Sequence, residues 1–182
     1  MKKLLIHTCC APCFTYIHDD ITIHKILFKE DVDVTALWYN PNIHPKFEYE
    51  RRKNTLISYC NSVNCKLDII DEYDIKSFLK NTINLDNRCS FCYYTRLNKL
   101  FSYAKENNFD MVMTTLSISP YQNQELLQKI GNDLELKYGI KYIHLDYTSK
   151  FREGQKLAKD LNLYRQKYCG CVLSMDSGKW EY

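Results

Sequence analysis

The chain has 182 residues, of which 45% are hydrophobic and 26% charged, a composition typical of a globular protein with one sizeable core. Its formal net charge of +3 is compatible with nucleic-acid binding but does not require it. No apolar run is long enough to span a membrane, and too few residues precede the first cysteines for a signal peptide, so we expect a cytoplasmic protein with one domain over residues 1–182.

Apolar and β-branched runs alternate with segments of helical periodicity along the chain. In order, they predict a strand at 3–6, a helix at 13–28, a strand at 32–39, a helix at 46–61, a strand at 65–70, and helices at 73–81 and 87–107. A strand at 111–115, a helix at 121–138 that ends at Gly139, a strand at 140–145 and a helix at 152–162 follow. This alternation predicts a single α/β domain, a mainly parallel open sheet of about five strands with helices on both faces, of the Rossmann-like kind.

The first predicted strand runs into three closely spaced thiols, Cys9, Cys10 and Cys13. Pro12 lies among them, and proline is tolerated in the first turn of a helix. The thiols therefore lie between the carboxyl end of a strand and the amino end of a helix. Open α/β sheets bind ligands at that edge, and a helix amino terminus favours thiolate over thiol.

Nine cysteines are many for a reducing compartment, where clustered thiols indicate metal or redox chemistry more often than structural disulfides. Cys89 and Cys92 lie about one helical turn apart, so both can face one metal centre. With Cys9 and Cys10 they make four thiolates, which suit a structural zinc site or a [4Fe–4S] cluster. The adjacency of Cys9 and Cys10 favours the cluster, because neighbouring residues strain to chelate one small ion. Cys13 could be a fifth ligand, a substitute for Cys10, or a thiol turned into the helix.

A third cluster, Cys169-Gly170-Cys171, lies in the carboxyl-terminal tail. Two thiols one residue apart can close a small, strained disulfide, which the intervening glycine permits. Such a bond is readily reduced and suits electron exchange, whereas further metal ligands or inert thiols are the alternatives. Cys60 and Cys65 flank a predicted helix–strand loop, and we expect them to be packing residues.

Other residues carry weaker signals. We expect His7 and His144 to be core histidines, whereas His44, between two prolines, is a candidate proton donor or metal ligand. Tyr121 follows a proline in a predicted loop and could stack on or protonate a base. The run Arg51-Arg52-Lys53 predicts either a phosphate-binding face or a solvated helix face. No glycine-rich phosphate loop occurs, which argues against a nucleotide-hydrolysing or dinucleotide-dependent enzyme.

Together these motifs resemble the QueH-type epoxyqueuosine reductases, the cobalamin-independent enzymes of tRNA queuosine synthesis. The resemblance runs nearly end to end and rests on the combination of motifs. The matching stretches are 7–13 (HTCCAPC), 40–45 (NPNIHP) with Glu48-Tyr49, 88–93 (RCSFCY) with Arg96-Leu97, 114–122 (TTLSISPYQ) and 163–171 (LYRQKYCGC).

The resemblance implies an iron–sulfur enzyme that acts on RNA. The implied ligands of a [4Fe–4S] cluster are Cys9, Cys10, Cys89 and Cys92, and the implied redox-active pair is Cys169 and Cys171. A further iron beside the cluster is implied too, with Cys13 and His44 as candidate ligands. The substrate would be a tRNA that carries epoxyqueuosine in its anticodon loop, and the product would be queuosine. The reaction needs an electron donor, which the sequence does not identify, and no membrane.

The number of electrons that this reaction consumes fits a protein with both a metal cluster and a dithiol. Reducing an epoxide to an alkene consumes two electrons and two protons. A cluster passes electrons singly, whereas a dithiol holds two. On the residues alone, two other classes remain open: a zinc-stabilised RNA-binding module without catalysis, and a thiol–disulfide oxidoreductase that acts on proteins through Cys169 and Cys171.

Overall fold

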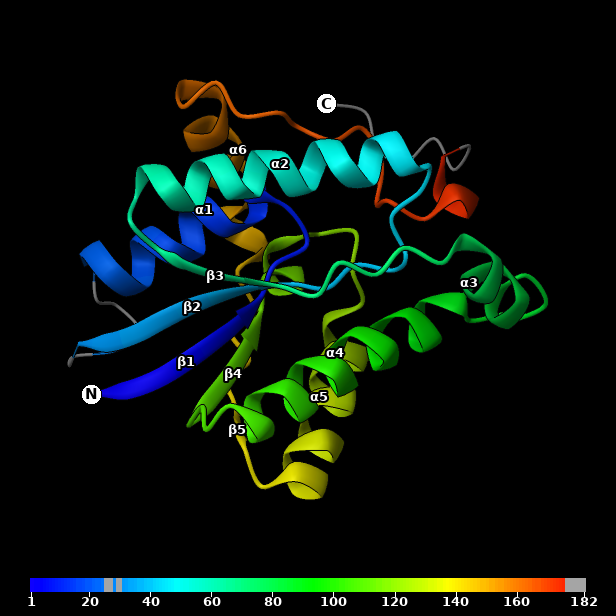
Figure 1. Cartoon of the computed structure of the whole chain (residues 1–182), viewed down its shortest axis with the longest axis horizontal. Coiled ribbons are helices and arrows are strands. Elements are labelled where there is room, and N and C mark those ends of the chain that lie inside the picture. Colours follow the sequence, from blue (N-terminus) through cyan, green and yellow to red (C-terminus); the bar gives the residue numbers. More distant parts are fainter. Residues whose placement is uncertain (25–27, 29–30, 176–182) are drawn as a thin grey trace.

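The computed structural model describes residues 1–24, 28 and 31–175, and its centre is a five-stranded parallel sheet (Figure 1). The strands lie in the spatial order β3-β2-β1-β4-β5. Their bounds are Lys2–His7 (β1), Val32–Trp38 (β2), Lys66–Ile69 (β3), Met111–Thr114 (β4) and Lys141–Tyr142 (β5). All four neighbouring pairs are parallel, which confirms the predicted α/β fold class.

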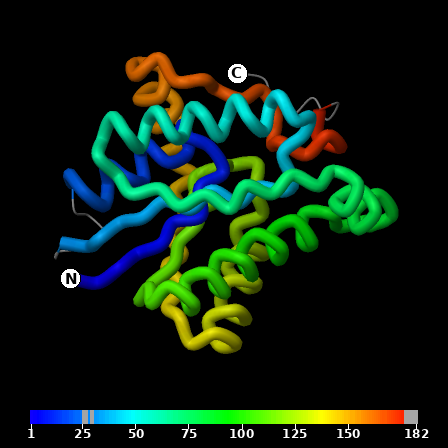
Figure 2. The backbone as a smooth tube through the Cα atoms, viewed as in Figure 1, coloured from blue at the N-terminus to red at the C-terminus, as the bar shows by residue number. Residues whose placement is uncertain are grey.

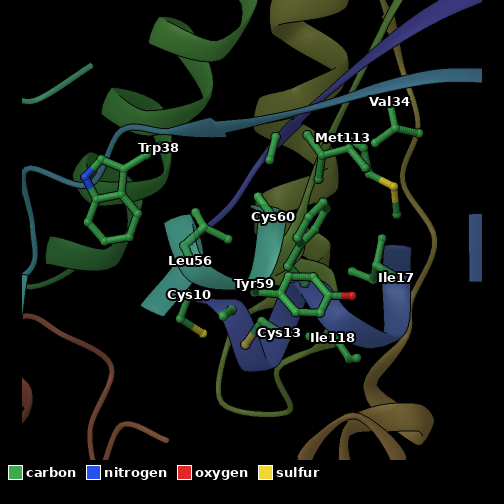
Figure 3. Packing of buried hydrophobic residues seen from close by; sticks show 14 of the residues in the cluster. Cys10, Cys13, Ile17, Val34, Trp38, Leu56, Tyr59, Cys60, Met113 and Ile118 are labelled. Atoms are coloured by element: carbon green, nitrogen blue, oxygen red, sulfur yellow. The ribbon is translucent and has the colours of Figure 1, made fainter. Parts of the chain in front are cut away.

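Helices cover both faces of the sheet (Figure 1). On one face lie α1 (Ala11–Asp19), α2 (Lys46–Ser62) and α6 (Phe151–Asp160), and on the other α4 (Arg88–Glu106) and α5 (Gln124–Tyr138). Successive β1 residues face opposite sides, so Leu4 and Ile6 join the first core and Leu5 the second. Figure 3 shows part of the first core, which includes Cys10 and Cys13. No helix in the described part is long and apolar enough to cross a membrane.

The sheet reverses its direction of winding at β1. The chain leaves β1 to form β2 and β3 on one side, and later adds β4 and β5 on the other side. At such a switch point the loops after the two central strands lead to opposite faces and leave a crevice between them. Here those loops begin at Thr8 and Thr115, so the first cysteine cluster lies in the crevice.

The first predicted helix is shorter than expected. After α1 the chain forms one π-helical turn, η1 (Asp20–His24). Thr22 Oγ1 donates a hydrogen bond to the His18 carbonyl oxygen at 2.7 Å, and the Asp20 carboxylate accepts one from Tyr147 Oη at 2.6 Å. These side-chain contacts, rather than α-helical periodicity, set the local backbone. Most of the remainder of the predicted helix lies outside the described residues.

Two further boundaries differ from the predicted ones by three residues, and the others by at most two. The strand predicted at 140–145 pairs only over Lys141–Tyr142, because it is an edge strand beside the four-residue β4. The helix predicted from residue 121 begins at Gln124, because the Asn123 side chain accepts a hydrogen bond from the Leu126 N–H at 2.9 Å and caps it. Its end is as predicted: Gly139 has a φ of 70°, the left-handed conformation that closes a helix.

The remaining short helix, α3 (Ile75–Thr82), lies beyond the carboxyl edge of the sheet, near the start of α4 (Figure 1). Its Phe78 packs with Cys92 and Cys171 in a small apolar group apart from the two main cores. This apolar group gives the cysteine motifs of α4 and the tail a common apolar wall.

Candidate active site

The first cysteine cluster forms a compact group where β1 ends and α1 begins. The Sγ atoms of Cys9, Cys10 and Cys13 all lie within 4.8 Å of one another, and those of Cys9 and Cys10 are 3.7 Å apart. Cys10 has extended backbone, and Pro12 occupies the first turn of α1, where its missing N–H is not needed. We call these three cysteines the thiol triad. Among the described residues it is the one group of this compactness with donors suited to a metal ion.

Hydrogen bonds from two distant segments hold the triad. Thr115 Oγ1 donates to Cys9 Sγ at 3.2 Å and accepts from the Cys9 N–H at 3.0 Å. Gln166 Nε2 donates to Cys10 Sγ at 2.9 Å. Hydrogen bonds from the Cys10 and Cys13 thiols hold the pKa of Cys9 well below its usual range, whereas burial raises the pKa of Cys10. The lowered pKa of Cys9 favours its thiolate form, and a metal ion that binds the triad would displace the protons that remain on its thiols.

A second group of cysteines surrounds a cavity of about 130 Å³, which we call the cysteine cavity. Cys89 and Cys92 line it from the first two turns of α4, and Cys169 and Cys171 line it from the tail. The Asn87 side chain caps α4 by accepting a hydrogen bond from the Ser90 N–H at 3.2 Å, which sets the orientation of that first turn. Burial raises the pKa of Cys92 to about 12.

Cys169 connects the two groups. It lines the cysteine cavity and also a smaller cavity of about 20 Å³, the triad cavity, which Cys9 and Cys13 line as well. Gln122 lines both cavities, and its Nε2 donates to Cys169 Sγ at 3.7 Å. The structure thus brings the three predicted cysteine clusters to one edge of the sheet. Cys169 and Cys171 are both free, so the expected disulfide is not formed in this structure.

The tail that carries the third cluster is held by buried Arg52 of α2. Its Nη1 and Nη2 donate to the carbonyl oxygens of Cys169 and Tyr168 at 3.1 and 3.0 Å. Its Nε donates to Glu48 Oε1 at 2.6 Å, and both side chains of this ion pair are 2% exposed. Figure 2 shows the red end of the described chain beside the start of α2. Arg52 therefore positions the backbone of the third cluster.

Gly170 makes a close contact that a larger residue would disturb. Its φ is 120°, and its carbonyl oxygen accepts a hydrogen bond from the His44 N–H at 2.7 Å. A Cβ at this position would lie 2.9 Å from Ile43 Cγ1. Both the backbone conformation and the close approach therefore require glycine between the two thiols.

The basic run at 51–53 is neither a phosphate-binding face nor a solvated one. Arg52 and Lys53 are both buried, and Lys53 Nζ lies 2.8 Å from Asp71 Oδ2. Arg51 is exposed but stacks over the Tyr164 ring at 3.8 Å. Arg51 and Arg52 instead hold the tail segment against α2, and Lys53 pairs with Asp71 in the segment after β3.

Replacing Arg52 by methionine should lower the free energy of unfolding by about 3–5 kcal/mol, because the Glu48 carboxylate would stay buried without its partner. Urea unfolding followed by circular dichroism measures this loss. The double variant Glu48→Gln/Arg52→Met should recover part of the stability, since it leaves no unpaired charge. A loss below about 1 kcal/mol in the single variant would mean that the pair does not anchor the tail.

Arg96 places a second buried positive charge beside the sulfur atoms. It lines the cysteine cavity, and its charge interacts with Cys92, Cys169 and Cys9. Its Nε donates to the Cys92 carbonyl oxygen at 3.3 Å, whereas its buried Nη2 has no hydrogen-bond partner. No carboxylate within the described ranges pairs with it. A buried cation without a counter-ion favours negative charge on the sulfur atoms around it.

The predicted histidines do not contribute their rings to the two sulfur cavities. His7 is a core histidine as predicted: its ring bonds Thr114 Oγ1 at 2.9 Å, and burial lowers its pKa to about 4. His144 is half-buried. His44 is buried, with its ring centroid 5.1 Å from that of Phe78, and it lines neither sulfur cavity. His44 therefore meets the third cluster through its backbone rather than its ring.

Cys60 and Cys65 lie away from the site, near the amino end of β3. Cys60 is buried in the first core, and half-buried Cys65 packs against that core, which is the packing role predicted for them.

Sequence reasoning assigned no role to several polar residues that contact the sulfur atoms or the tail. They lie within stretches that carry the family resemblance, namely Thr115, Gln122, Gln166 and Arg96, whereas Arg52 was predicted only as part of a phosphate-binding or solvated face. Their position beside a cysteine motif or after a strand indicated a place near the site. The sulfur atoms and tail carbonyl groups that most of them contact, however, lie far away in the sequence.

Comparisons with known proteins agree with this geometry. A family model described as "Epoxyqueuosine reductase QueH" matches residues 4–177. The chain belongs to the QueH family. Relatives named epoxyqueuosine reductase QueH include those of Dehalococcoides mccartyi (31% identity, 94% of this chain and 92% of the relative) and Thermotoga maritima (32%, 96% and 91%). A third, from Staphylococcus epidermidis, is 31% identical over 94% of this chain and 76% of its own. The resemblance drawn from the motifs is thus confirmed, and the QueH name denotes an oxidoreductase.

A solved structure shares the fold with this QueH chain. It is the U34-tRNA thiolase NcsA from Methanococcus maripaludis with its [4Fe–4S] cluster, superposed with a TM-score of 0.64 at 17% identity. The match covers 97% of this chain and 62% of the thiolase, so the chain spans less than two thirds of that protein. At this identity the likeness shows a common fold.

Proposed function

We propose that this QueH chain reduces epoxyqueuosine in a tRNA anticodon loop to queuosine, with loss of the epoxide oxygen as water. The observation that carries the proposal is the convergence of three cysteine clusters at the switch point of the sheet, with Cys169 lining both sulfur cavities. Family membership supplies the reaction, and this arrangement supplies the redox groups that it needs.

The proposed ligands of a [4Fe–4S] cluster are Cys9, Cys10, Cys89 and Cys92. The residues present fit such a group: the donors are all thiols, and buried Arg96 has an unpartnered Nη2 that would offset the negative charge of a thiolate-ligated cluster. When bound, the cluster would pass electrons one at a time. Cys13 is the better supported candidate for a further iron, because it belongs to the triad, whereas His44 lines neither cavity.

The dithiol of Cys169 and Cys171 can supply both electrons that the reaction needs. Closing their disulfide releases two electrons and two protons, which is what conversion of an epoxide to an alkene and water consumes. Their burial raises the pKa of both thiols, so both carry protons at neutral pH. Arg52 and Gly170 hold the backbone of this pair in place. An external electron donor would then reopen the disulfide.

One observation favours a second candidate, a zinc-stabilised RNA-binding module. Two thiolates on one tetrahedral zinc ion lie about 3.8 Å apart, given Zn–S bonds of about 2.3 Å. The Cys9 and Cys10 Sγ atoms are 3.7 Å apart, so their adjacency does not prevent them from sharing one ion. Metal identity therefore separates the two candidates.

The test begins with protein purified without oxygen. We expect about four iron and four acid-labile sulfide per chain, with a visible absorption spectrum. With dithionite as reductant, it should convert epoxyqueuosine in a tRNA to a product lighter by one oxygen atom in mass spectrometry. One zinc per chain, no sulfide and no change in mass would overturn the reductase and favour the RNA-binding module.

A further inference from the structure

A third cavity lies beside the sulfur site, and no part of the proposed chemistry uses it. It has a volume of about 720 Å³, within the range of about 300–1,000 Å³ that holds small organic ligands. We call it the outer groove. The residues that give it its chemical character are Tyr121, Phe151, Arg152, Gln155 and Arg165.

The charged side chains that line the outer groove are all positive. Arg152 and Arg165 both line it, and no carboxylate does. Both arginines are exposed, and within the described ranges neither has an ion pair or a side-chain hydrogen bond. Elsewhere in the described structure, exposed Lys66 and Lys141 do pair with carboxylates. Two unpaired guanidinium groups at one cavity suit the oxygen atoms of a phosphate.

The outer groove also offers aromatic surface that continues into the sulfur site. The rings of Tyr121 and Phe151 lie 5.9 Å apart, nearly perpendicular at 88°. Tyr121 also lines the cysteine cavity, and Phe151 also lines the triad cavity. A ligand in the groove would therefore be adjacent to whatever occupies the sulfur site. The segment after α6, which carries Arg165, runs over α2 toward the third cluster (Figure 2).

We propose that the outer groove binds one unpaired nucleotide of the substrate RNA, next in sequence to the modified nucleotide. Its phosphate would lie on Arg152 and Arg165, and its base against Tyr121 and Phe151. Unpaired RNA is recognised by this combination of cationic and aromatic side chains. The inference rests on the proposed function, since it takes the sulfur site as the place of the modified nucleotide.

The first test is binding of an unmodified anticodon stem-loop hairpin, measured by fluorescence anisotropy over a range of salt concentrations. We expect Arg152→Gln/Arg165→Gln to bind at least tenfold more weakly than the native chain. The salt dependence should also flatten, by roughly 0.7 in log–log slope for each phosphate that the variant no longer neutralises. The matched control is Lys2→Gln/Lys129→Gln, which removes the same charge at exposed positions outside the groove. It should change binding less than threefold. Equal binding by the arginine variant and the native chain would overturn the proposal.

A second test addresses the base. Hairpins that carry an abasic residue on one side or the other of the modified position should differ, and one of them should bind the native chain at least about fivefold more weakly. If neither loses affinity, no base lies in the groove. A free nucleoside monophosphate should compete only at millimolar concentration, and competition at micromolar concentration would overturn the assignment to RNA.

Hairpin binding and epoxyqueuosine reduction test the outer groove and the reductase activity separately. Hairpin binding needs neither electrons nor epoxide. If the native chain fails to reduce epoxyqueuosine but its hairpin binding depends on the two arginines, the groove assignment stands alone. If reduction proceeds and the arginine variant matches the native chain in binding and kcat/KM, the reductase stands and the groove assignment is wrong.

Discussion

Replacing Cys169 or Cys171 by serine should reduce the turnover of epoxyqueuosine-tRNA by at least about 10³-fold while the iron and sulfide content stays unchanged. A serine hydroxyl cannot form the disulfide, so the pair could no longer release two electrons and two protons together. The two residues act as a unit, and the double variant should therefore be no worse than either single variant. Single-turnover assays with iron analysis of the same samples make the measurement.

The matched control for this prediction is Cys65→Ser. Cys65 is half-buried near the opposite edge of the sheet and lines neither sulfur cavity, so its removal should leave both turnover and iron unchanged. If the Cys169 and Cys171 variants lose iron together with activity, the two thiols are metal ligands. If they keep full activity, the electrons come from elsewhere and the dithiol has no redox role.

Replacing Cys89 or Cys92 by alanine should remove most of the iron and sulfide and abolish the visible absorption. The same loss is expected for Cys9→Ala and Cys10→Ala, because each proposed ligand holds a different iron. Cys13→Ala is the informative comparison, since Cys13 lies within the thiol triad but is not a proposed cluster ligand. It should keep four sulfides and lose at most one iron.

The opposite pattern of sulfide loss among these variants would assign the cluster to different cysteines. If Cys13→Ala loses all sulfide while the Cys89 and Cys92 variants keep it, the triad holds the cluster. Cys65→Ala is the control for handling and oxidation. Circular dichroism should show that each variant keeps the native helix content, because α4 is capped by Asn87 independently of its cysteines.

Local patterns in the sequence were enough to predict the elements and their order. Periodicity and turn residues are local properties, so each strand and most helices appear where they were expected, and Gly139 ends α5. Errors occurred where a side chain with a distant partner set the backbone, as Asp20 does with Tyr147 at the end of the first helix. The short edge strand β5 likewise depends on the length of its neighbour.

The sequence by itself determined that the chain is an α/β protein and that its first cysteine cluster lies at the carboxyl edge of its sheet. The metal or redox chemistry predicted for the cysteines rests on residue types and spacing, which need no knowledge of long-range contacts. Only the tertiary structure decided how the clusters meet: Thr115 reaches Cys9 across 106 positions, and Gln166 reaches Cys10 across 156. It also decided that Arg52 holds the tail, that Arg96 stays unpaired and that Arg152 and Arg165 share one groove. These depend on which surfaces pack together, a property of the whole chain that no local pattern encodes.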